Sequence, residues 1–531
     1  MSAWRDPAAV SLRAGGPLAV GLVALVLARV ALLPGLAFWD TGEFQAVGPL
    51  LGTAHPTGYP AYVILSWLAS IAFLPLGEPA YRVNLLSAVL FATACGLTVV
   101  LVRELTGRAV VAVGAGLLLA LTPLAWRMGT HADPHTLHLA LVALLLVLLV
   151  GWENRRLMRA SGADRWLLAA ASVFGIAVAN HSLSLLAVPA IGLYVLAVHP
   201  GVVLRPRLVL ACLGLAATVG GLLYLELPIR AVLGAPLVYG HPDTWEGFTY
   251  VATGEQFRGH VLPLFADLDR KTGELVARAL AELGPLAVLV PAGFLAAIVR
   301  RPRYALLSSV AFVVTCLFDA AYVNAAIDRY YLGPLLLAVS WLGIGAAAVA
   351  GALASWGGSA ASPPGPAASP PGPAEPGPGS TAPIRAGFLV SLAAAAILAG
   401  PAILAAPGSF ARADRSGDVT ARRWVDGTLA MLPDHALVQS WWSFSTALWY
   451  ATLVEGQRPD VTVVDDRDLL DQDLGTVEDL IEANLGRRPV FVLRPESEIT
   501  DLARRWVLER WDDPADIQPV WQVVARRGAA P

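Results

Sequence analysis

The sequence predicts a polytopic α-helical membrane protein that carries a small α/β domain at its C-terminus. Three observations lead to this fold class. Of the 531 residues, 56% are hydrophobic and only 15% are charged, whereas soluble domains average about a quarter charged residues. Apolar runs of membrane-spanning length recur through most of the chain. Beyond residue 408, short β-like runs alternate with helical patterns, which is typical of an α/β domain.

Crossing about 30 Å of hydrocarbon takes roughly 17–25 apolar residues in a helix. Runs of this kind predict about eleven transmembrane helices, at residues 17–37, 83–102, 109–127, 136–151, 166–180, 183–198, 207–227, 283–299, 304–325, 331–353 and 386–407. A cleaved signal peptide is the alternative for the first run, which is long for that purpose.

Arginines mark every second loop between these helices. They lie before the first span, after the second, fourth and sixth, and after the eighth, the last group being Arg300, Arg301 and Arg303. The positive-inside rule therefore predicts a cytoplasmic N-terminus and an extracytoplasmic C-terminal domain, in the cell (inner) membrane. Residues 61–76 are also apolar, but counting them as a span would put the arginines outside. We expect this stretch to lie along, or dip into, the outer membrane surface.

The chain divides into four predicted parts. Residues 1–353 form the main transmembrane domain, and residues 354–385 form a disordered, Pro/Gly-rich cytoplasmic linker. The last transmembrane helix follows at 386–407, and residues 408–531 form the external domain. In that domain the runs ALVQS, VTVVDD, PVFVLR and PVWQVVA read as strands of a largely parallel sheet. The segments TARRWVDGTLAML, TVEDLIEANL and ITDLARRWVLERW read as helices.

Charge and cysteine content exclude several classes of function. The net charge is −3 and no basic cluster occurs, so nucleic acid is not an expected partner. The three cysteines lie inside apolar runs, so neither a disulfide framework nor a cysteine metal site is expected.

Polar and ionisable side chains concentrate in the loops predicted to be external. Such groups are costly beside hydrocarbon unless they are paired or functional. Loops from separate helices can converge on one water-facing cleft, so these residues are the candidates for a functional site. They are Asp40, Glu43, His55, Tyr59, Arg82, Asn84, His131, Asp133, His181, Arg230, Arg329 and Tyr330.

Each of these candidates also has an ordinary structural interpretation. Asp40 and Glu43 are spaced like a capping box, and His55 can be a turn residue. Arg82 and Arg230 can anchor helix ends at the lipid headgroups. His131 and His135 are spaced for a metal on one helix face, although Pro134 weakens a continuous helix there. Asp328 and Arg329 can be a local ion pair.

An ordered set of motifs resembles one family of membrane enzymes. DTGEF, GTAHPTGYPAY and RVNLLSA resemble the N-terminal signature of the GT-C membrane glycosyltransferases of glycosyltransferase family 117, which reads D-S-G-E, A-H-P-P-G-Y-P and R-V-N-L. HADPHTLHLAL, GIAVANHSLSLL, YLELPIRA, IDRYYLGP and VEGQRPDVTVVD resemble later motifs in the same order. Two positions depart from the pattern: Asp133 replaces a glutamate, and His135 replaces an aromatic residue.

The resemblance implies a GT-C fold and transfer of a sugar from a polyprenyl-phosphate carrier to a hydroxyl acceptor outside the membrane. Mannose and protein Ser/Thr are the sugar and acceptor of eukaryotic relatives, and a glycan hydroxyl or a lipid stays open as acceptor. The implied catalytic pair is Asp40 and Glu43, with Asp40 as general base and inversion at the anomeric carbon. Arginine suits the leaving phosphate, so Arg329, Arg82 and Arg230 are the expected ligands, and Tyr330 would line the sugar or lipid groove.

Cofactor use and competing functions stay open at this point. No cofactor is required by the scheme, but Asp40, Asp133 and His131 are a possible set for Mg²⁺ or Mn²⁺. A transporter or flippase of envelope precursors is the main alternative, although no inverted repeat is apparent. A membrane scaffold with a binding domain is a third class, and it would have no need for acids in the first external loop.

Overall fold

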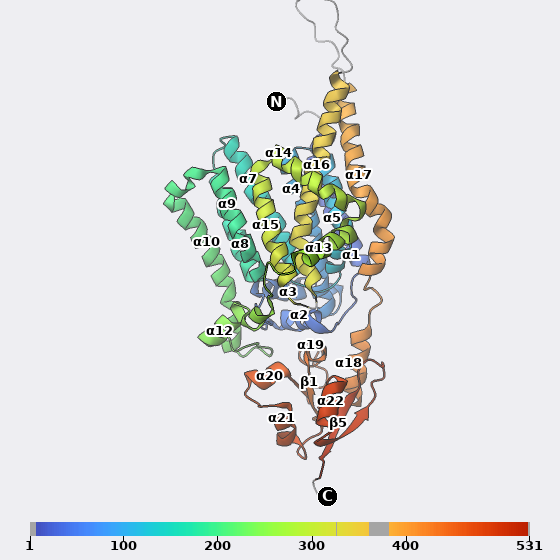
Figure 1. Ribbon diagram of the computed structural model, residues 1–531. Helices are drawn as coiled ribbons and strands as arrows, with labels where there is room; N and C mark the ends of the chain where they lie inside the picture. Colours follow the sequence, from blue (N-terminus) through green and yellow to red (C-terminus); the bar gives the residue numbers. More distant parts are fainter. Residues whose placement is uncertain (1–6, 325, 360–381, 529–531) are drawn as a thin grey trace, which may run out of the picture.

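Long apolar helices run side by side in the computed structural model, and a sheet domain lies at one end of them (Figure 1). The structure describes residues 7–324, 326–359 and 382–528. The membrane part contains α1 (Pro7–Val30), α2 (Trp39–Leu50), α3 (Pro60–Ala72), α4 (Pro79–Thr106), α5 (Ala109–Leu121), α6 (Pro123–Met128), α7 (His135–Leu157), α8 (Asp164–Asn180), α9 (Val188–Val198), α10 (Pro206–Tyr224), α11 (Glu226–Val232), α12 (Trp245–Ala252), α13 (Leu268–Leu283), α14 (Val290–Arg300), α15 (Pro302–Ala321), α16 (Leu332–Ser359) and α17 (Ala382–Ala413). Short 3-10 segments are η1 (Leu74–Leu76), η2 (Ser182–Ala187), η3 (Pro200–Leu204), η4 (Glu255–His260), η5 (Gly284–Leu289) and η6 (Ile327–Tyr331).

The chain is a multi-pass membrane protein. Within the described residues, seven helical segments are long and apolar enough to span a bilayer, and they coincide with predicted spans. The segments are Pro79–Thr106, His135–Leu157, Pro206–Val232, Leu268–Arg300, Pro302–Ala321, Ile327–Trp356 and Gly387–Ala413. Gly15–Val30, Ala109–Leu121 and Ser182–Val198 are apolar but shorter. The predicted span 109–127 is divided, because Pro123 removes a backbone donor and α5 ends before it.

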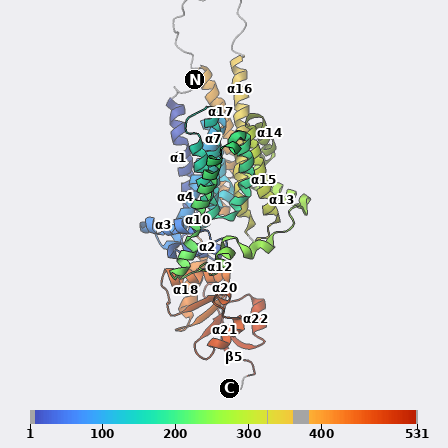
Figure 2. The ribbon, with the colours of Figure 1, turned by 90° about the vertical axis from the view of Figure 1, so that its left-hand side faces the viewer.

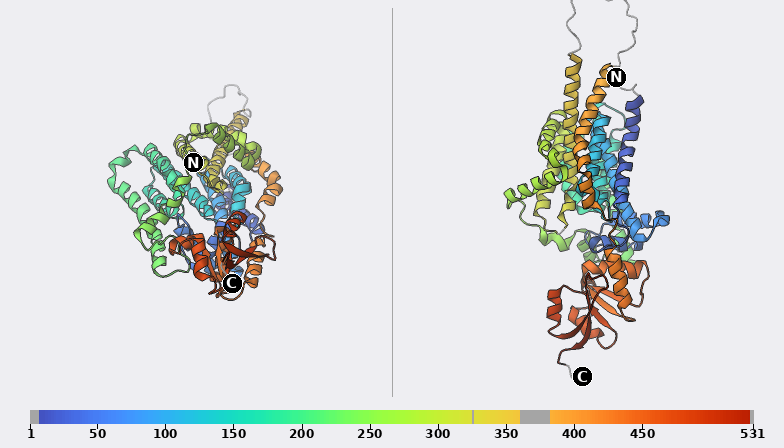
Figure 3. Two further views of the ribbon diagram at one scale, coloured as in Figure 1. Left: turned by 60° about the horizontal axis from the view of Figure 1, so that its bottom comes forward. Right: turned by 90° about the vertical axis from the view of Figure 1, so that its right-hand side faces the viewer.

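The helix at Pro60–Ala72 (α3) does not run with the bundle. It leaves the base of the bundle sideways in two views that agree (Figures 2 and 3). Together with α2 it forms a layer between the membrane helices and the sheet domain (Figure 1). The apolar helix Pro60–Ala72 is shorter than a membrane span, and its position at the outer membrane surface stays a prediction.

The arginine-rich loops gather at the opposite end of the bundle. Arg301 donates to the carbonyl of Leu105 at 2.7 Å and to Asn154 Oδ1 at 2.9 Å. Arg303 pairs with Glu153 at 3.2 Å. These contacts tie the ends of α4 and α7 to the α14–α15 connection. Of the predicted linker 354–385, the ends belong to α16 and α17, and residues 360–381 lie outside the described part.

The C-terminal sheet domain contains a sheet with order β2-β1-β3-β5-β4 in its described residues. Its elements are α18 (Thr420–Met431), β1 (Leu437–Ser440), α19 (Trp442–Trp449), the π-helical segment η7 (Tyr450–Val454), β2 (Thr462–Asp465), α20 (Asp466–Asp471), α21 (Val477–Asn484), β3 (Val490–Val492), α22 (Glu496–Leu502), β4 (Trp506–Trp511) and β5 (Val520–Arg526). β2, β1 and β3 are parallel, as expected, whereas β5 pairs antiparallel with both β3 and β4.

The fourth strand corrects one prediction. The segment ITDLARRWVLERW reads as a helix, but only its first residues belong to α22, and Trp506–Trp511 form β4. Pairing with β5 decides the outcome, since the hairpin buries Trp506 against the sheet and satisfies the backbone of both strands. Tertiary pairing of this kind is not visible in the local pattern.

The sheet domain shares an apolar cluster with the membrane part. Leu36, Ala46 and Ala80 pack in one buried cluster with Trp424 and Phe444 of the external domain. Polar contacts join the same surfaces: Tyr450 Oη accepts from the Ala80 amide at 3.0 Å, and Arg422 bonds Glu78 at 3.1 Å. The two parts are therefore packed against each other rather than joined by a free linker.

Gly42 lies in the contact between α2 and α19, where a larger side chain should destabilise the protein. A Cβ at Gly42 would lie 2.3 Å from the Ala37 carbonyl oxygen and 2.8 Å from Thr446 Oγ1. Gly42→Ala should therefore lower the free energy of unfolding by about 1–3 kcal/mol, measured as a lower thermal midpoint in detergent. The matched control is Gly333→Ala, which meets no atom within 4 Å and should be neutral or stabilising. Equal midpoints for the two variants would contradict the close packing of α2 on α19.

Candidate functional site

A cavity of about 1450 Å³ lies where the loops predicted to be external meet the sheet domain. It draws its lining from each of these loops and from the sheet domain. The predicted site residues that line it are Asp40, His55, Tyr59, His131, Asp133, His181, Arg329 and Tyr330. The sequence predicts that every second loop lies on the same side of the membrane part. The structure brings these residues from separate loops to one cavity.

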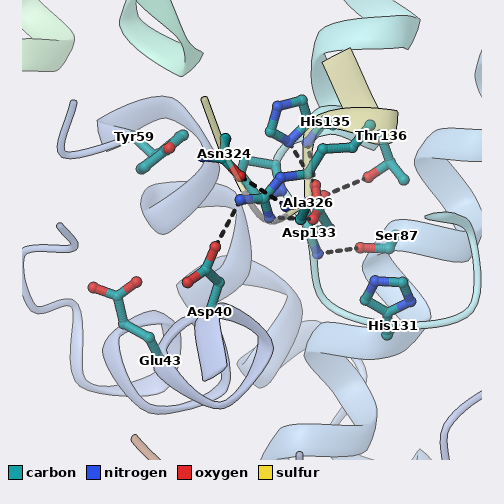
Figure 4. A network of polar contacts seen from close by, with 12 residues as sticks. Asp40, Glu43, Tyr59, Ser87, His131, Asp133, His135, Thr136, Asn324 and Ala326 are labelled. Atoms are coloured by element: carbon teal, nitrogen blue, oxygen red, sulfur yellow. Dashed lines mark hydrogen bonds and ion pairs between the residues drawn. The ribbon is translucent and has the colours of Figure 1, made fainter. Parts of the chain in front are cut away.

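One guanidinium holds two carboxylates at the centre of the site. Arg329 NH2 donates to Asp40 Oδ2 at 2.7 Å, and its NH1 donates to Asp133 Oδ2 at 3.2 Å. Figure 4 shows Asp40 between Glu43 and Asp133, with its carboxylate turned toward this bridge. Arg329 is therefore paired with residues far away in the sequence. Its neighbour Asp328 instead bonds Arg127 and Arg278, so the predicted local pair of Asp328 and Arg329 is wrong.

Each member of this triad is placed by local backbone structure. Asp40 is in the first turn of α2, where the unpaired amides of a helix start favour negative charge. Asp133 precedes α7 and accepts the His135 amide at 2.7 Å and His135 Nδ1 at 2.8 Å. Arg329 belongs to η6, directly before α16. The triad thus ties together the loops before α2, before α7 and before α16.

Asp40 is held in its ionised form. Burial alone would raise the pKa of this carboxyl, but the charges of His55 and Arg329 and the hydrogen bonds it accepts outweigh burial and lower the pKa. One of these bonds comes from Trp442, whose indole Nε1 donates to Asp40 Oδ1 at 3.1 Å. A carboxylate oxygen has two lone pairs, so each oxygen can still accept a further hydrogen bond.

Glu43 faces His55 rather than the large cavity. It is 2% exposed, its Oε1 accepts the His55 amide at 2.6 Å, and its Oε2 is paired with His55 Nδ1. Burial alone would lower the pKa of His55, but the Glu43 carboxylate outweighs it and the pKa is raised. The other ring nitrogen of His55 lies 3.3 Å from Tyr59 Oη. The pair therefore fixes the HPTGYP loop and places the His55 imidazole beside Asp40.

An aromatic wall continues from this loop. The ring centres of Tyr59 and His181 lie 5.3 Å apart, and those of His181 and Tyr330 lie 5.5 Å apart. Within the described residues, His181 Nε2 and Arg329 Nε are buried without a hydrogen-bond partner. Buried polar atoms usually have a hydrogen-bond partner. The absence of one among the described residues makes these two nitrogens candidates for a hydrogen bond to a substrate.

Three predicted substrate ligands lie outside the lining of this cavity. Arg82 donates to the carbonyls of Gly77 and Ser70, each at 2.7 Å. Arg230 donates to the Leu51 carbonyl at 2.6 Å, at the end of α2. Asn84 is fully buried and bonds the Leu33 and Gly35 carbonyls. In this arrangement the three side chains hold the first loop in shape, and a role in substrate binding stays a prediction for them.

The residues predicted for a divalent cation do not fit one in this arrangement. Asp40 and Asp133 both face the Arg329 guanidinium, which already balances the charge that would hold a cation. The described residues contain no cluster of three His, Cys, Asp or Glu side chains suited to a metal. Dependence on Mg²⁺ or Mn²⁺ stays a prediction.

The sheet domain supplies site residues that were not among the predicted candidates. Trp442, Asp465, Asp466 and Arg467 line the cavity, and Trp442 touches Asp40 directly. The available signals were the motif VEGQRPDVTVVD, which ends at Asp465, and the pair Trp441-Trp442 directly after a predicted strand. Ligand sites of α/β sheets lie at the carboxyl ends of parallel strands, so two neighbouring tryptophans there were a usable hint.

Comparisons with known proteins match the N-terminal part of this chain. Residues 40–201 match the family model of the N-terminal domain of protein O-mannosyl-transferase TMEM260. The mouse protein O-mannosyl-transferase TMEM260 is 32% identical over 224 residues, which cover 41% of this chain and 30% of the mouse protein. The chain therefore spans less than a third of that relative's length. The matched segment contains Asp40, Glu43, His55, Asp133 and His181.

Solved structures show the fold of the whole chain. ArnT from Cupriavidus metallidurans, bound to undecaprenyl phosphate, aligns over 97% of this chain and 99% of its own with a TM-score of 0.60 and 14% identity. The apo structure of the same enzyme aligns over 98% and 99% with the same TM-score and identity. ArnT is a GT-C glycosyltransferase, and the chain has the GT-C fold.

The carboxylate bridge predicts a strong effect of Arg329 on stability. Arg329→Ala leaves two largely buried carboxylates without a counter-charge, which should cost about 3–5 kcal/mol of unfolding free energy. Adding Asp133→Asn should recover part of that loss, since it removes one of the two unpaired charges. Arg504→Ala is the control, because Arg504 is 77% exposed, and it should stay within about 0.5 kcal/mol. If Arg329→Ala were as stable as Arg504→Ala, the carboxylate bridge would be contradicted.

The Glu43–His55 pair predicts a pH dependence of stability. A group whose pKa is raised on folding stabilises the folded state fully below its unfolded pKa, which is about 6.5 for histidine, and this contribution is lost as the pH rises through the raised value. The thermal midpoint of the wild type should therefore fall from pH 6 upward, and Glu43→Gln should flatten that fall. Glu246→Gln, at an exposed position, should leave it unchanged. Identical pH slopes in all three proteins would rule out the charged pair.

Proposed function

We propose that this protein transfers a sugar from a polyprenyl-phosphate carrier to a hydroxyl acceptor at the extracytoplasmic edge of the membrane. The observation that carries the proposal is the Asp40–Arg329–Asp133 bridge in the wall of the large cavity. It combines a phosphate-binding cation and a carboxylate base within one hydrogen-bonded unit.

The cavity suits a lipid-linked donor. Leu183, Leu185, Leu186 and Phe318 line it on the side of the membrane helices, where a polyprenyl chain can lie against apolar side chains. Asp40, His55 and Arg329 line the part beside the sheet domain, where a sugar phosphate can be hydrogen-bonded. A GT-C enzyme of the same fold has been solved with undecaprenyl phosphate bound, which supports a carrier of this class.

The chemistry is a single displacement. An acceptor oxygen attacks the anomeric carbon, the bond from that carbon to the phosphate oxygen breaks, and polyprenyl phosphate leaves. Asp40 takes the hydroxyl proton as the new bond forms, which is general base catalysis, and attack opposite the leaving group inverts the anomeric centre. The leaving phosphate carries its own charge, so it needs a cation rather than a proton. Arg329, whose Nε has no partner among the described residues, can bind it in a bidentate manner.

Binding of the donor also prepares the base. A low pKa makes Asp40 ionised but weakly basic. A phosphate that shares the Arg329 guanidinium would weaken one of the interactions that keep the pKa of Asp40 low. The base would then become stronger at the moment when the donor is in place, closer to the matched pKa that general base catalysis favours.

Mannose and protein Ser/Thr hydroxyls are the sugar and acceptor that we propose. Their support is the likeness of residues 40–201 to a protein O-mannosyl-transferase domain. We place the N-terminus in the cytoplasm and the sheet domain outside the inner membrane. The gathering of arginine-rich loops at the end away from the sheet domain supports this orientation through the positive-inside rule.

Asp40→Asn is the direct test of the base. The amide keeps the size of the side chain but cannot take a proton, so transfer of labelled sugar from its polyprenyl phosphate should fall at least about 100-fold. Asp434→Asn, which changes a side chain 94% exposed on the sheet domain, should transfer sugar at the wild-type rate. Near-wild-type turnover of the Asp40 variant in purified, folded protein would show that another group accepts the proton.

A further inference from the structure

Two helices from distant parts of the chain meet at their first residues. α2 of the membrane part begins at Trp39, and α19 of the sheet domain begins at Trp442. The indole Nε1 of Trp442 donates to Asp40 Oδ1 across 402 positions of sequence, while Arg329 donates to Asp40 Oδ2. The two oxygens of this carboxylate are thus held by donors from the two different domains.

The Trp442 ring is itself fixed from three sides. It meets His55 edge-on at 5.7 Å between ring centres, Tyr239 at 6.1 Å and Trp449 at 5.9 Å. Trp442 is half-buried and borders the cavity, and these three ring contacts restrict the rotamers that its side chain can adopt. Trp442 can therefore hold the Asp40 carboxylate in a defined plane.

The sheet domain presents the appropriate edge to the cavity. β1 ends at Ser440, directly before Trp441 and Trp442, and β2 ends at Asp465. Asp465, Asp466 and Arg467 line the cavity together with Trp442. The carboxyl ends of two neighbouring parallel strands thus face the site, which is the position where α/β sheets place their ligands.

We propose that Trp442 is a positioning residue of the transfer reaction, so that the sheet domain completes the site instead of merely lying beside it. The proposal rests on the proposed function, and it deepens it. A base must keep its oxygen within hydrogen-bond reach of the proton that it takes. A carboxylate turns easily about its last torsion, since that torsion is broad. Two donors on opposite oxygens remove this freedom.

Trp442→Phe and Trp441→Phe form a matched pair of variants. Both keep an aromatic ring and lose one indole N–H. The N–H of Trp442 donates to Asp40, whereas Trp441 Nε1 is buried without a partner in the described structure, so its removal should be neutral. Any general effect of replacing an indole by a phenyl ring should appear in both variants.

Steady-state kinetics of the purified full-length protein, with a polyprenyl-phosphate sugar as donor, give the first readout. Trp442→Phe should lower kcat about tenfold, the size of losing one hydrogen bond to a charged group, with the donor KM within about twofold. The acid limb of its pH profile should move to higher pH, because the Trp442 bond helps to lower the pKa of Asp40. Trp441→Phe should behave as wild type. Equal kcat and pH profiles for the two variants would overturn the proposal.

A second readout does not depend on activity and separates this proposal from the proposed function. The thermal midpoint between pH 6 and pH 3 is measured for wild type, Trp442→Phe, Asp40→Asn and the double variant. Trp442→Phe should lower the midpoint in the wild-type background and have little further effect in the Asp40→Asn background, because the two residues share one bond. Additive effects would overturn the positioning role even if sugar transfer is observed. Coupled effects without any transfer would sustain the Trp442–Asp40 contact and reject the proposed function.

Discussion

The structure depends on one guanidinium that serves two carboxylates. Arg329 lies between Asp40 and Asp133, and each of the three residues comes from a different loop at the same end of the bundle. Burying such charges is costly unless they are paired and hydrogen-bonded. The loops can therefore come together only in the arrangement that satisfies all three residues. The same requirement creates chemistry: a cation suited to phosphate and a carboxylate with free lone pairs end up in the wall of a cavity that is apolar on its membrane side.

The sheet domain is fixed by the same surface that forms the site. A shared apolar cluster and the close approach of Gly42 to Thr446 bring α2 and α19 into direct contact. Asp40 and Trp442 stand at the first turns of these two helices, so the packing that docks the domain also sets the geometry of the carboxylate. In Figure 3 the sheet domain covers the end of the bundle at which α2 lies. A motion of the domain would therefore disturb the site directly.

Hydropathy was sufficient to predict a multi-pass helical membrane protein, and the alternation of loops was sufficient to predict that Asp40, His55, Asp133 and Arg329 come together. Details set by long-range contacts were not predictable. From the sequence, the adjacent Asp328 is a plausible ion-pair partner of Arg329. The structure instead pairs Arg329 with Asp40 and Asp328 with Arg278. β4 forms only because β5 is available for pairing. Arg82, Asn84 and Arg230 bond backbone carbonyls of loops whose course the sequence does not state. Trp442 reaches Asp40 across 402 positions, and no local pattern encodes that distance.

The central claim is that the cavity converts a lipid-linked sugar and does not merely move it. It is tested most directly with purified protein in vesicles that contain a radiolabelled sugar on polyprenyl phosphate and a Ser/Thr peptide in the surrounding buffer. The account predicts label on the peptide and release of an equal amount of polyprenyl phosphate. Labelled donor that changes leaflet but stays intact, with an unlabelled peptide, would contradict it.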